Sequence, residues 1–488
     1  MPKPNELNAQ QIIRKIRGNE ATAQECVEAV FERIHQLETK INAYVTLTEE
    51  QALKKAKEID TKISAGKHVG KMAGIPIAIK DAICTRGITT TCSSRMLENF
   101  VPPYDAEVIE RIKREDGIII GKTNMDEFAM GSSTETSYFG TTRNPWDTTR
   151  VPGGSSGGSA ACIATDEATL SLGTDTGGSI RCPASYCSVV GLKPTYGLVS
   201  RYGLIAYANS LEQIGPMAKD VTDCALFLSV IAGHDAKDGT SVDAAPKDYT
   251  EYLKDSVEGF RIGVPREFFG EGTSEDVEKQ VWNSIHKLEE LGATYEETSL
   301  PTLEHSLATY YIIAMSEASS NLARYDGLRY GYRVEKDEGD WATVYSQDRR
   351  AGFGAEVRRR IILGTYALSA GYYNKYYMKA LKVRTLIRNN FEEAYKKFDV
   401  LIGPTMPFPP FKIGEKIEDP LALYMSDVDT VSANLAGLPA ISVPCGFTDG
   451  LPIGLQILAP PLREDLVLQT AYTFEQNTTY KNRKPAVN

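Results

Sequence analysis

Histidine is scarce in this chain of 488 residues, which contains only five. They are His35, His68, His234, His286 and His305, so residues 69–233 contain none. A catalytic site within that region must take its general base from another residue type, or recruit a histidine from outside the region.

The chain also lacks a long hydrophobic run. The longest one, Cys224–Gly233, is far shorter than the roughly 20 apolar residues that a membrane-spanning helix needs. The N-terminus, MPKPNE, has neither the apolar core of a signal peptide nor the composition of a transit peptide. We therefore expect no membrane association and a cytoplasmic location.

An excess of basic residues is absent as well. Lysine and arginine number 54 against 64 aspartates and glutamates, which gives a formal net charge of −10. A bare nucleic-acid-binding surface needs a basic stripe, so the composition argues against one in this chain, although a partner could bind nucleic acid. Because 42% of the residues are hydrophobic, extensive disorder is excluded.

Cysteines with the spacing of metal ligands are also missing. The eight cysteines are scattered, and no C-x-x-C sequence occurs. In a chain of this length the pattern indicates reduced structural thiols, neither a disulfide framework nor a zinc site. We expect no metal site in this chain.

The hydrophobic pattern predicts an α/β fold. Residues 1–65 are expected to form an N-terminal helical extension, and residues 66–488 one large domain, because no clear linker divides the chain. The catalytic core is expected at about residues 74–230, and a substrate-pocket and helical part at about residues 258–488.

Local patterns place individual elements. Thr22 and Glu25 form a T-x-x-E capping box, which predicts a helix beginning there. Ile75, Ile77 and Ile79 alternate with other residues, as in a strand. Further strands are expected at 117–120, 260–264, 400–403 and 440–444, and further helices at 49–62 and 277–291.

Three segments, in order, carry the strongest chemical signal. In the first, GIPIAIKD, Lys80 follows an apolar strand, and apolar surroundings lower the pKa of a lysine, as a lysine base requires. The second is PGGSSGGS at 152–159, whose glycines can hold strained backbone geometries. In the third, GTDTGGSIR at 173–181, Ser179 follows two glycines whose N–H groups can form an oxyanion hole.

Together these segments suggest a hydrolytic or acyl-transfer site. A serine needs a base to become nucleophilic. Lys80 is the simplest candidate for this base, because the region lacks histidine. Ser155 could relay the proton between Lys80 and Ser179. Taken singly, each segment also has an interpretation without any catalytic role. The first could be a surface lysine, the second a flexible linker and the third a Gly-Ser turn.

Two neighbouring patterns resemble other motifs but fit them poorly. GGSSG at 153–157 matches the G-x-S-x-G string of a nucleophile elbow, but no strand is expected to lead into it. GIIIGKT at 117–123 is one residue too short between its glycines for a Walker phosphate-binding loop. We interpret it as a strand ending in a turn.

The segment from about residue 74 to residue 203 closely resembles the amidase signature family. The most specific matches are GGSSGGS at 153–159 and GTDTGGSIR at 173–181. The resemblance implies a single large domain in which helices cover both faces of a mixed central β-sheet.

The resemblance also implies a Ser–cis-Ser–Lys triad. Lys80 matches the base of that triad, Ser155 the cis serine and Ser179 the acylated nucleophile. The implied oxyanion hole is the backbone of Thr176, Gly177 and Gly178.

Three further segments are similar to the branch of this family that serves tRNA-dependent amidotransferases: NMDEFAMGSSTE at 124–135, SEASSNLARYDG at 316–327 and NLAGLP at 434–439. The resemblance runs nearly the whole chain and implies glutamine as the substrate, hydrolysed through a glutamyl-enzyme intermediate. Arg359 matches the position that binds its α-carboxylate, and Asp427 the position that binds its α-ammonium group. The other implied pocket residues are Met130, Gly131 and Tyr310.

Neighbouring residues leave two of these assignments open. Arg359 lies between Arg358 and Arg360, so it could belong to the solvated face of a basic helix. Asp429 falls where the family more often has an apolar residue, so the choice between Asp427 and Asp429 as the ammonium ligand is open.

The same resemblance implies a heterotrimer. A GatB-like subunit would receive the ammonia and use ATP and Mg²⁺ to convert Glu-tRNA(Gln) and/or Asp-tRNA(Asn) to Gln-tRNA(Gln) and Asn-tRNA(Asn). A small GatC-like subunit would join the two larger ones. We expect no cofactor in this chain, and tRNA would be bound through the partner subunit.

Three alternatives remain open. A free-standing amidase would use the same fold and triad on another small amide. A non-catalytic assembly protein would keep the fold without the activity, although all three catalytic positions are intact. A Ser-His-Asp esterase would require one of the five histidines as its base.

Overall fold

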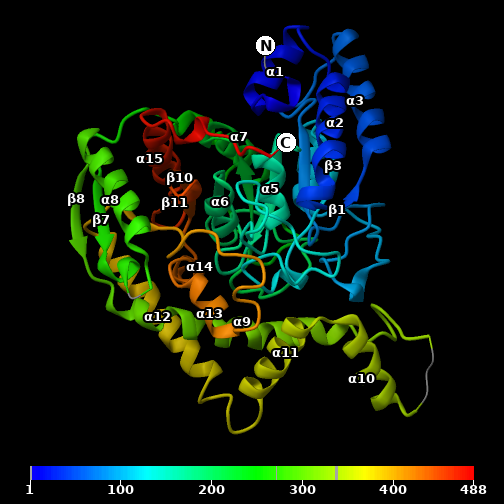
Figure 1. The fold of residues 1–488 in the computed structure, drawn as a ribbon, viewed down its shortest axis with the longest axis vertical. Coiled ribbons are helices and arrows are strands. Elements are labelled where there is room, and N and C mark those ends of the chain that lie inside the picture. Colours follow the sequence, from blue (N-terminus) through cyan, green and yellow to red (C-terminus); the bar gives the residue numbers. More distant parts are fainter. Residues whose placement is uncertain (1–2, 271, 336–338, 488) are drawn as a thin grey trace.

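A single mixed sheet forms the centre of the protein (Figure 1). The computed structural model describes residues 3–270, 272–335 and 339–487. In this part of the chain the sheet has eleven strands in the order β1-β3-β2-β4-β6-β5-β10-β11-β9-β7-β8. The strands are β1 Tyr44–Leu47, β2 Pro76–Lys80, β3 Ile118–Thr123, β4 Leu170–Asp175, β5 Val190–Lys193, β6 Gln213–Ala218, β7 Arg261–Pro265, β8 Thr294–Thr298, β9 Val400–Pro404, β10 Ala440–Thr448 and β11 Leu451–Leu458.

Parallel pairing occurs near the two ends of the sheet, although the edge strand β1 is antiparallel to β3. Strand β2 runs parallel to both β3 and β4, and β7 runs parallel to both β8 and β9. The middle of the sheet, from β4 to β9, is antiparallel. This arrangement places β2 between two parallel neighbours, so its last residue, Lys80, is surrounded by protein.

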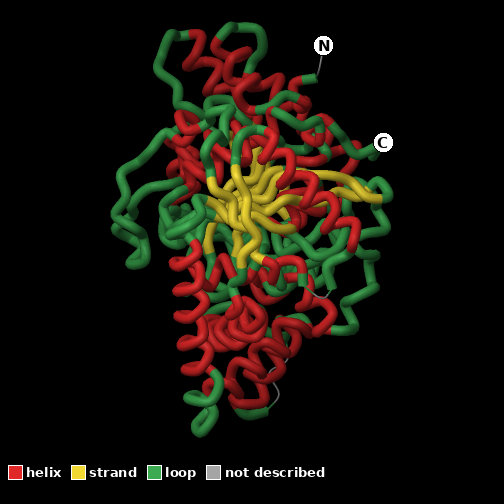
Figure 2. The backbone as a smooth tube through the Cα atoms, turned by 90° about the vertical axis from the view of Figure 1, so that its left-hand side faces the viewer, coloured by secondary structure: helices red, strands yellow, loops and turns green. Residues whose placement is uncertain are grey.

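Helices cover both faces of the sheet, and Figure 2 shows the strands at the centre of the molecule. Helices α5 and α6 pack on one face, and α4, α7, α15 and α8 on the other. Helices α9–α12 form a separate layer at the lower end in Figure 1. The helices are α1 Ala9–Arg17, α2 Ala23–Ile41, α3 Glu49–Ser64, α4 Glu107–Arg114, α5 Gly157–Ala164, α6 Arg181–Cys187, α7 Val221–Ile231, α8 Glu275–Glu290, α9 Ser306–Asn321, α10 Trp341–Gly352, α11 Ala355–Leu368, α12 Tyr377–Ala394, α13 Pro420–Tyr424, α14 Val431–Ala436 and α15 Glu464–Gln476.

The predicted α/β class, with helices on both faces of a mixed sheet, is confirmed. The capping box is also present: Glu25 N donates to Thr22 Oγ1 at 3.1 Å, and Thr22 N donates to Glu25 Oε2 at 2.8 Å. The N-terminal segment contributes more than helices, because its strand β1 pairs with β3 at the edge of the sheet. That strand was not predicted from the sequence.

The described residues form three hydrophobic cores, of which the smallest includes Val151 and Cys182. The largest core lies between the sheet and its covering helices, including α2 and α8. The second core joins α9, α12 and α14 to the loops around Met125–Met130. The predicted glutamine-pocket residues Met130 and Tyr310 belong to this second core.

The cysteines are all buried and unpaired. None of the helices in the described ranges is long and apolar enough to cross a bilayer.

Candidate active site

Lys80 is the last residue of β2, and its side chain is fully buried. Its Nζ donates to Ser155 Oγ at 2.7 Å, to Thr174 Oγ1 at 2.8 Å and to the Thr174 carbonyl at 3.3 Å. Burial lowers the pKa of Lys80 to about 7, although the carboxylates of Asp126 and Asp175 oppose that effect. A lysine with such a pKa can exchange a proton near neutral pH.

Ser155 lies in a tightly packed turn before α5. The peptide bond between Gly154 and Ser155 is cis. The Ser155 carbonyl accepts a hydrogen bond from Asp126 N at 3.2 Å. A side chain at Gly154 would collide with the Asp126 carboxylate, so only glycine fits there. The turn thereby presents the Ser155 hydroxyl to Lys80.

Asp175 organises the turn that carries Ser179. It is the last residue of β4 and accepts hydrogen bonds from Gly178 N at 2.8 Å and Ile180 N at 3.2 Å. Its carboxylate also receives Nε and Nη2 of Arg181, each at 3.0 Å. Burial alone would raise the pKa of Asp175, but Arg181 holds it at about 2. The carboxylate is therefore ionised and holds the turn closed.

The two glycines of this turn are required by their surroundings. A side chain at Gly177 would collide with the ring of Tyr310. Gly178 has φ of 138°, and a side chain there would collide with Thr430. Thr430 Oγ1 donates to the Gly177 carbonyl at 2.6 Å, which fixes the orientation of the peptide that follows.

The backbone donors around Ser179 differ in their availability. The N–H of Gly178 is occupied by Asp175. Across the described residues, no acceptor engages the N–H groups of Thr176, Gly177 and Ser179. These three donors are therefore available to an oxyanion, whereas Gly178 supports the turn.

Ser179 and Ser155 are brought together by a backbone contact. The N–H of Ser156 donates to the Ser179 carbonyl at 3.2 Å. The Ser179 side chain is the more accessible of the two, since the residue is 8% exposed whereas Ser155 is fully buried. Nothing in the described chain hydrogen-bonds the Ser179 hydroxyl. A nucleophile at this position could meet a substrate on one side and Ser155 on the other.

Asp427 lies on the short 3₁₀ turn Met425–Asp427 and is nearly buried. It accepts hydrogen bonds from Ser132 Oγ at 2.7 Å and from the Tyr311 hydroxyl at 2.6 Å. Burial raises the pKa of Asp427 to about 6, with these two donors opposing the rise. The carboxylate can thus be charged at neutral pH.

Asp429 has different surroundings. It is 2% exposed, and its Oδ2 has no hydrogen-bond partner within the described chain. Burial raises the pKa of Asp429 well above its ordinary value. Asp427, whose carboxylate accepts two hydrogen bonds, is therefore the better candidate of the two for an ammonium ligand.

The arginine beside Asp427 is Arg360 and not Arg359. The Arg359 side chain is exposed and pairs with Glu356, and both residues line a cavity of about 260 Å³. Arg360 is 2% exposed, and its Cζ lies 5.3 Å from the ring centroid of Tyr311, which bonds Asp427. Its Nε and Nη1 bond Glu356 and the Tyr207 hydroxyl, each at 2.7 Å. The predicted Arg359 is thus not the arginine packed against Tyr311, and its predicted role in binding a carboxylate stays a prediction.

The helical spacing on α11 indicates that Arg360 is the buried arginine. The buried stripe of this helix includes Val357, Arg360, Gly364 and Ala367, which are three and four residues apart. Gly364 lies against Met315 of α9, where any side chain would collide with the backbone. The face of α11 that carries Arg360 therefore faces α9, the helix of Tyr310 and Tyr311.

Met130 and Gly131 lie at the turn that supports Asp427. Met130 is fully buried, and Gly131 abuts the Asp126 carboxylate, leaving no space for a side chain. The next residue, Ser132, is the donor to Asp427. These positions thus shape the turn, and Ser132 was not singled out from the sequence.

Asp126 is a further residue that was missed in the sequence. Its Oδ2 accepts from Thr134 N at 2.9 Å and Ser133 N at 3.3 Å, and its Oδ1 accepts from Thr136 Oγ1 at 2.9 Å. Burial raises its pKa, and these donors lower it. Because the surrounding backbone groups are donors, the ionised carboxylate fits the site better than the acid.

Neither of the two poorly fitting motifs forms the site that its pattern suggests, and the histidines take no part in the site. Lys122 of the GIIIGKT sequence is buried within β3 and lies 3.6 Å from Asp81. Ser155 is not preceded by a strand, as a nucleophile elbow would require. All five histidines are exposed. A histidine base for Ser179 is therefore excluded in this arrangement.

Comparisons with known proteins agree with this geometry. The sequence profile of the family described as Amidase matches residues 25–468. The chain is 59% identical to the A subunit of the glutamyl-tRNA(Gln) amidotransferase of Methanosarcina barkeri, over 98% of both chains. It is 58% identical to the protein of the same name from Thermoanaerobacter pseudethanolicus, again over 98% of both. The crystal structure of the corresponding protein from Thermotoga maritima matches with a TM-score of 0.81 at 41% identity, over 97% of this chain and 95% of that one.

The environment of Lys80 generates a prediction about pH dependence. A lysine base acts in its neutral form, so the hydrolytic rate should rise as pH increases through about 7. Asp126 stabilises the ammonium form, and Asp126→Asn should therefore lower the Lys80 pKa and move this rise to lower pH, by about one unit or less. The measurement is kcat/KM against pH for the substrate that the enzyme hydrolyses.

The control for this measurement is Asp465→Asn, which removes a surface carboxylate paired with Arg463. It should leave the pH profile unchanged. Asparagine at 126 also places an amide N–H₂ against backbone donors, so a lower maximal rate is expected. The pH at which the rate rises is independent of that amplitude, and an unchanged midpoint would contradict the electrostatic role of Asp126.

Proposed function

The chain belongs to the amidase family, and we propose that it is the glutamine-hydrolysing component of a tRNA-dependent amidotransferase. The observation that carries the chemistry is the 2.7 Å hydrogen bond from the buried Lys80 to Ser155, beside the turn that presents Ser179. The extent of the similarity to amidotransferase A subunits supports the choice within the family.

Glutamine is the proposed substrate because two opposite charges lie beside the turn. Asp427 would bind the α-ammonium group, and the guanidinium of Arg360 would bind the α-carboxylate. Nη2 of Arg360 bonds no other group in the described ranges, so a donor is available. Tyr310 lies against Gly177 and beside Tyr311, and would contact the aliphatic part of the substrate.

In the proposed reaction, Ser179 Oγ attacks the side-chain carboxamide carbon. The Ser179 proton passes to Ser155, and the Ser155 proton passes to neutral Lys80. The negative charge that develops on the carboxamide oxygen is stabilised by free backbone N–H groups of the turn, with Thr176 and Gly177 as the main donors.

The tetrahedral intermediate then breaks its C–N bond. The proton held by Lys80 returns through Ser155 to the leaving nitrogen, which departs as ammonia and leaves a glutamyl ester on Ser179. Water attacks this ester with Lys80 and Ser155 again accepting the proton. The products are glutamate and the free serine.

The proposal includes partner subunits that the chain does not contain. Ammonia would pass to a GatB-like subunit, which would bind ATP, Mg²⁺ and the mischarged tRNA, and a GatC-like subunit would join the assembly. The names of the relatives, which refer to glutamyl-tRNA(Gln), support this context. The complex would work in the cytoplasm, where aminoacyl-tRNA is used.

The first test is ammonia release from glutamine by the purified chain, alone and with its GatB-like and GatC-like partners. Ser179→Ala and Lys80→Ala should each reduce the rate on the order of a thousandfold or more, because triad members act as a unit. Ser229→Ala is a suitable control, since Ser229 bonds only backbone groups near α7 and lies outside the site.

The same assay separates the two enzymatic hypotheses. Strong preference for glutamine and stimulation by the partners are the expected results. Faster release from simple amides, with no effect of the partners, would replace the proposal with a free-standing amidase. Full activity in Lys80→Ala would contradict the triad itself.

A second test compares the two neighbouring arginines. Arg360→Gln should raise KM for glutamine by roughly 10- to 100-fold, because it removes a charged hydrogen bond to the substrate carboxylate. Arg359→Gln is the matched control and should have little effect. The measurement is steady-state kinetics with glutamine and with propionamide, which lacks the α-groups.

Propionamide shows whether Arg360 acts on the substrate or only on the fold. A substrate role predicts that Arg360→Gln spares the rate with propionamide, whereas a folding defect would reduce both rates together. An Arg359→Gln variant that lost glutamine selectivity would return the assignment to Arg359.

A further inference from the structure

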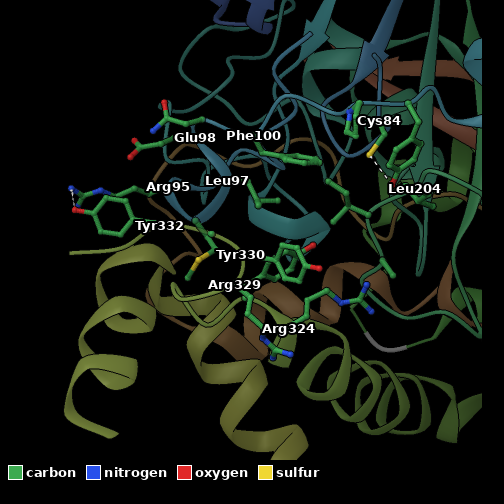
Figure 3. A pocket seen from close by; sticks show the side chains of 18 residues that line it. Cys84, Arg95, Leu97, Glu98, Phe100, Leu204, Arg324, Arg329, Tyr330 and Tyr332 are labelled. Carbon is green, nitrogen blue, oxygen red and sulfur yellow. Dashed lines mark hydrogen bonds between the residues drawn. The ribbon is translucent and has the colours of Figure 1, made fainter. Parts of the chain in front are cut away.

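A cavity of about 790 Å³ lies apart from the residues of the proposed reaction (Figure 3). Its walls come from Cys84 and from three segments that lie within residues 95–104, 204–206 and 324–332. Its volume is within the usual range for ligand-binding pockets. None of the triad or glutamine-binding residues lines it.

The charge of this cavity is opposite to that of the chain. Three arginines line it, against the single carboxylate of Glu98. Arg329 pairs with Asp326, but within the described ranges neither Arg95 nor Arg324 forms an ion pair. Arg95 lies over the ring of Tyr332, and Arg324 donates to the Asn321 carbonyl, but neither contact neutralises the charge. Two guanidinium groups without a carboxylate partner, in a chain of net charge −10, indicate a site for a negatively charged ligand.

The remaining lining is apolar and aromatic. Phe100, Tyr104 and Leu204 are among the lining residues, and Tyr330, which also lines the cavity, is 61% exposed. Arginine, tyrosine and phenylalanine together, with little lysine or aspartate, are typical of the energetically important centre of a protein–protein interface. An inorganic anion would leave this apolar surface uncovered.

The walls are fixed to each other by specific contacts. Tyr332 N donates to the Met96 carbonyl at 2.8 Å, and Arg95 Nη2 donates to the Tyr332 hydroxyl at 2.7 Å. Gly331 lies so close to Met96 that a side chain there would collide with the methionine sulfur. Two segments far apart in the sequence thus form one preorganised surface, which lowers the entropic cost of binding.

We propose that this cavity binds an acidic segment of a partner protein that carries a large apolar side chain. Carboxylates of the segment would pair with the guanidinium groups of Arg95 and Arg324, whose fork geometry suits them. The apolar side chain would occupy the space beside Phe100 and Leu204 and cover the exposed rim. The proposal concerns assembly, and it does not depend on the catalytic roles of Lys80, Ser155 and Ser179.

The test is a selection of random 12-residue displayed peptides on the purified chain, with counter-selection against the double variant Arg95→Gln/Arg324→Gln. The recovered peptides are then synthesised and titrated calorimetrically. We expect sequences that combine two or more acidic residues with an aromatic or large aliphatic one. The double variant should weaken their binding by roughly tenfold or more, and added salt should weaken it further.

Two further variants keep the result interpretable if Arg95→Gln disturbs the wall. Tyr330→Glu changes only an exposed rim residue and should also abolish binding of acidic peptides, by charge repulsion. Arg388→Gln, on the exposed surface of α12, is the matched control and should bind normally. Ser179→Ala should bind as the wild type does, which separates this test from that of the catalytic proposal.

Recovery of no peptide that distinguishes the wild type from the double variant would overturn the proposal. So would a set of basic or uncharged peptides, or binding that Tyr330→Glu leaves unchanged. Acidic peptides whose apolar residue can be replaced by serine without loss of affinity would indicate a site that binds only anions. That result would also contradict the proposed occupant.

Discussion

The buried ion pair between Asp175 and Arg181 is the interaction on which the rest of the site depends. Burying two charges is costly unless hydrogen bonds satisfy both, and here they do. Asp175 binds the backbone of the catalytic turn, while Arg181 donates to Asn434 Oδ1 at 2.7 Å and to the Thr430 carbonyl at 3.0 Å. The pair therefore joins the end of β4 to α14, and Ser179 is positioned by segments about 250 residues apart.

The charge of Asp175 also affects the pKa of Lys80. Burial of the lysine favours the neutral amine, whereas Asp126 and Asp175 favour the ammonium ion, and the balance brings the pKa to about 7. Both carboxylates have structural partners of their own, Asp175 in the Ser179 turn and Asp126 beside Gly154. The groups that shape the two catalytic turns are thus also the groups that set the basicity of the lysine. A change in either turn would alter both geometry and proton affinity.

The parts of this arrangement that sequence could predict are those encoded locally. The alternating isoleucines before Lys80 predicted a strand, and Ile77 and Ile79 lie in β2. The two glycine-rich segments form the turns that carry Ser155 and Ser179. Strand β4 was not predicted, because only its first three residues, LSL, alternate between apolar and polar, and all six residues of LSLGTD are buried. Asp126 gave no local signal either. Its role follows from the approach of Gly154 and from the donors of the turn after Gly131, which only the folded chain brings together.

The geometry of α11 determines which of the two neighbouring arginines, Arg359 and Arg360, is buried beside Tyr311. Neighbouring residues on an α-helix point about 100° apart, so only one of two adjacent arginines can face α9. Glu356 does not determine which arginine is buried, because it pairs with both. It lies three residues before Arg359 and four residues before Arg360. The choice is made by Gly364, four residues beyond Arg360, because its missing side chain lets α11 approach the backbone of α9. The glycine, and not the run of charges, determines which guanidinium lies beside Tyr311 and Asp427.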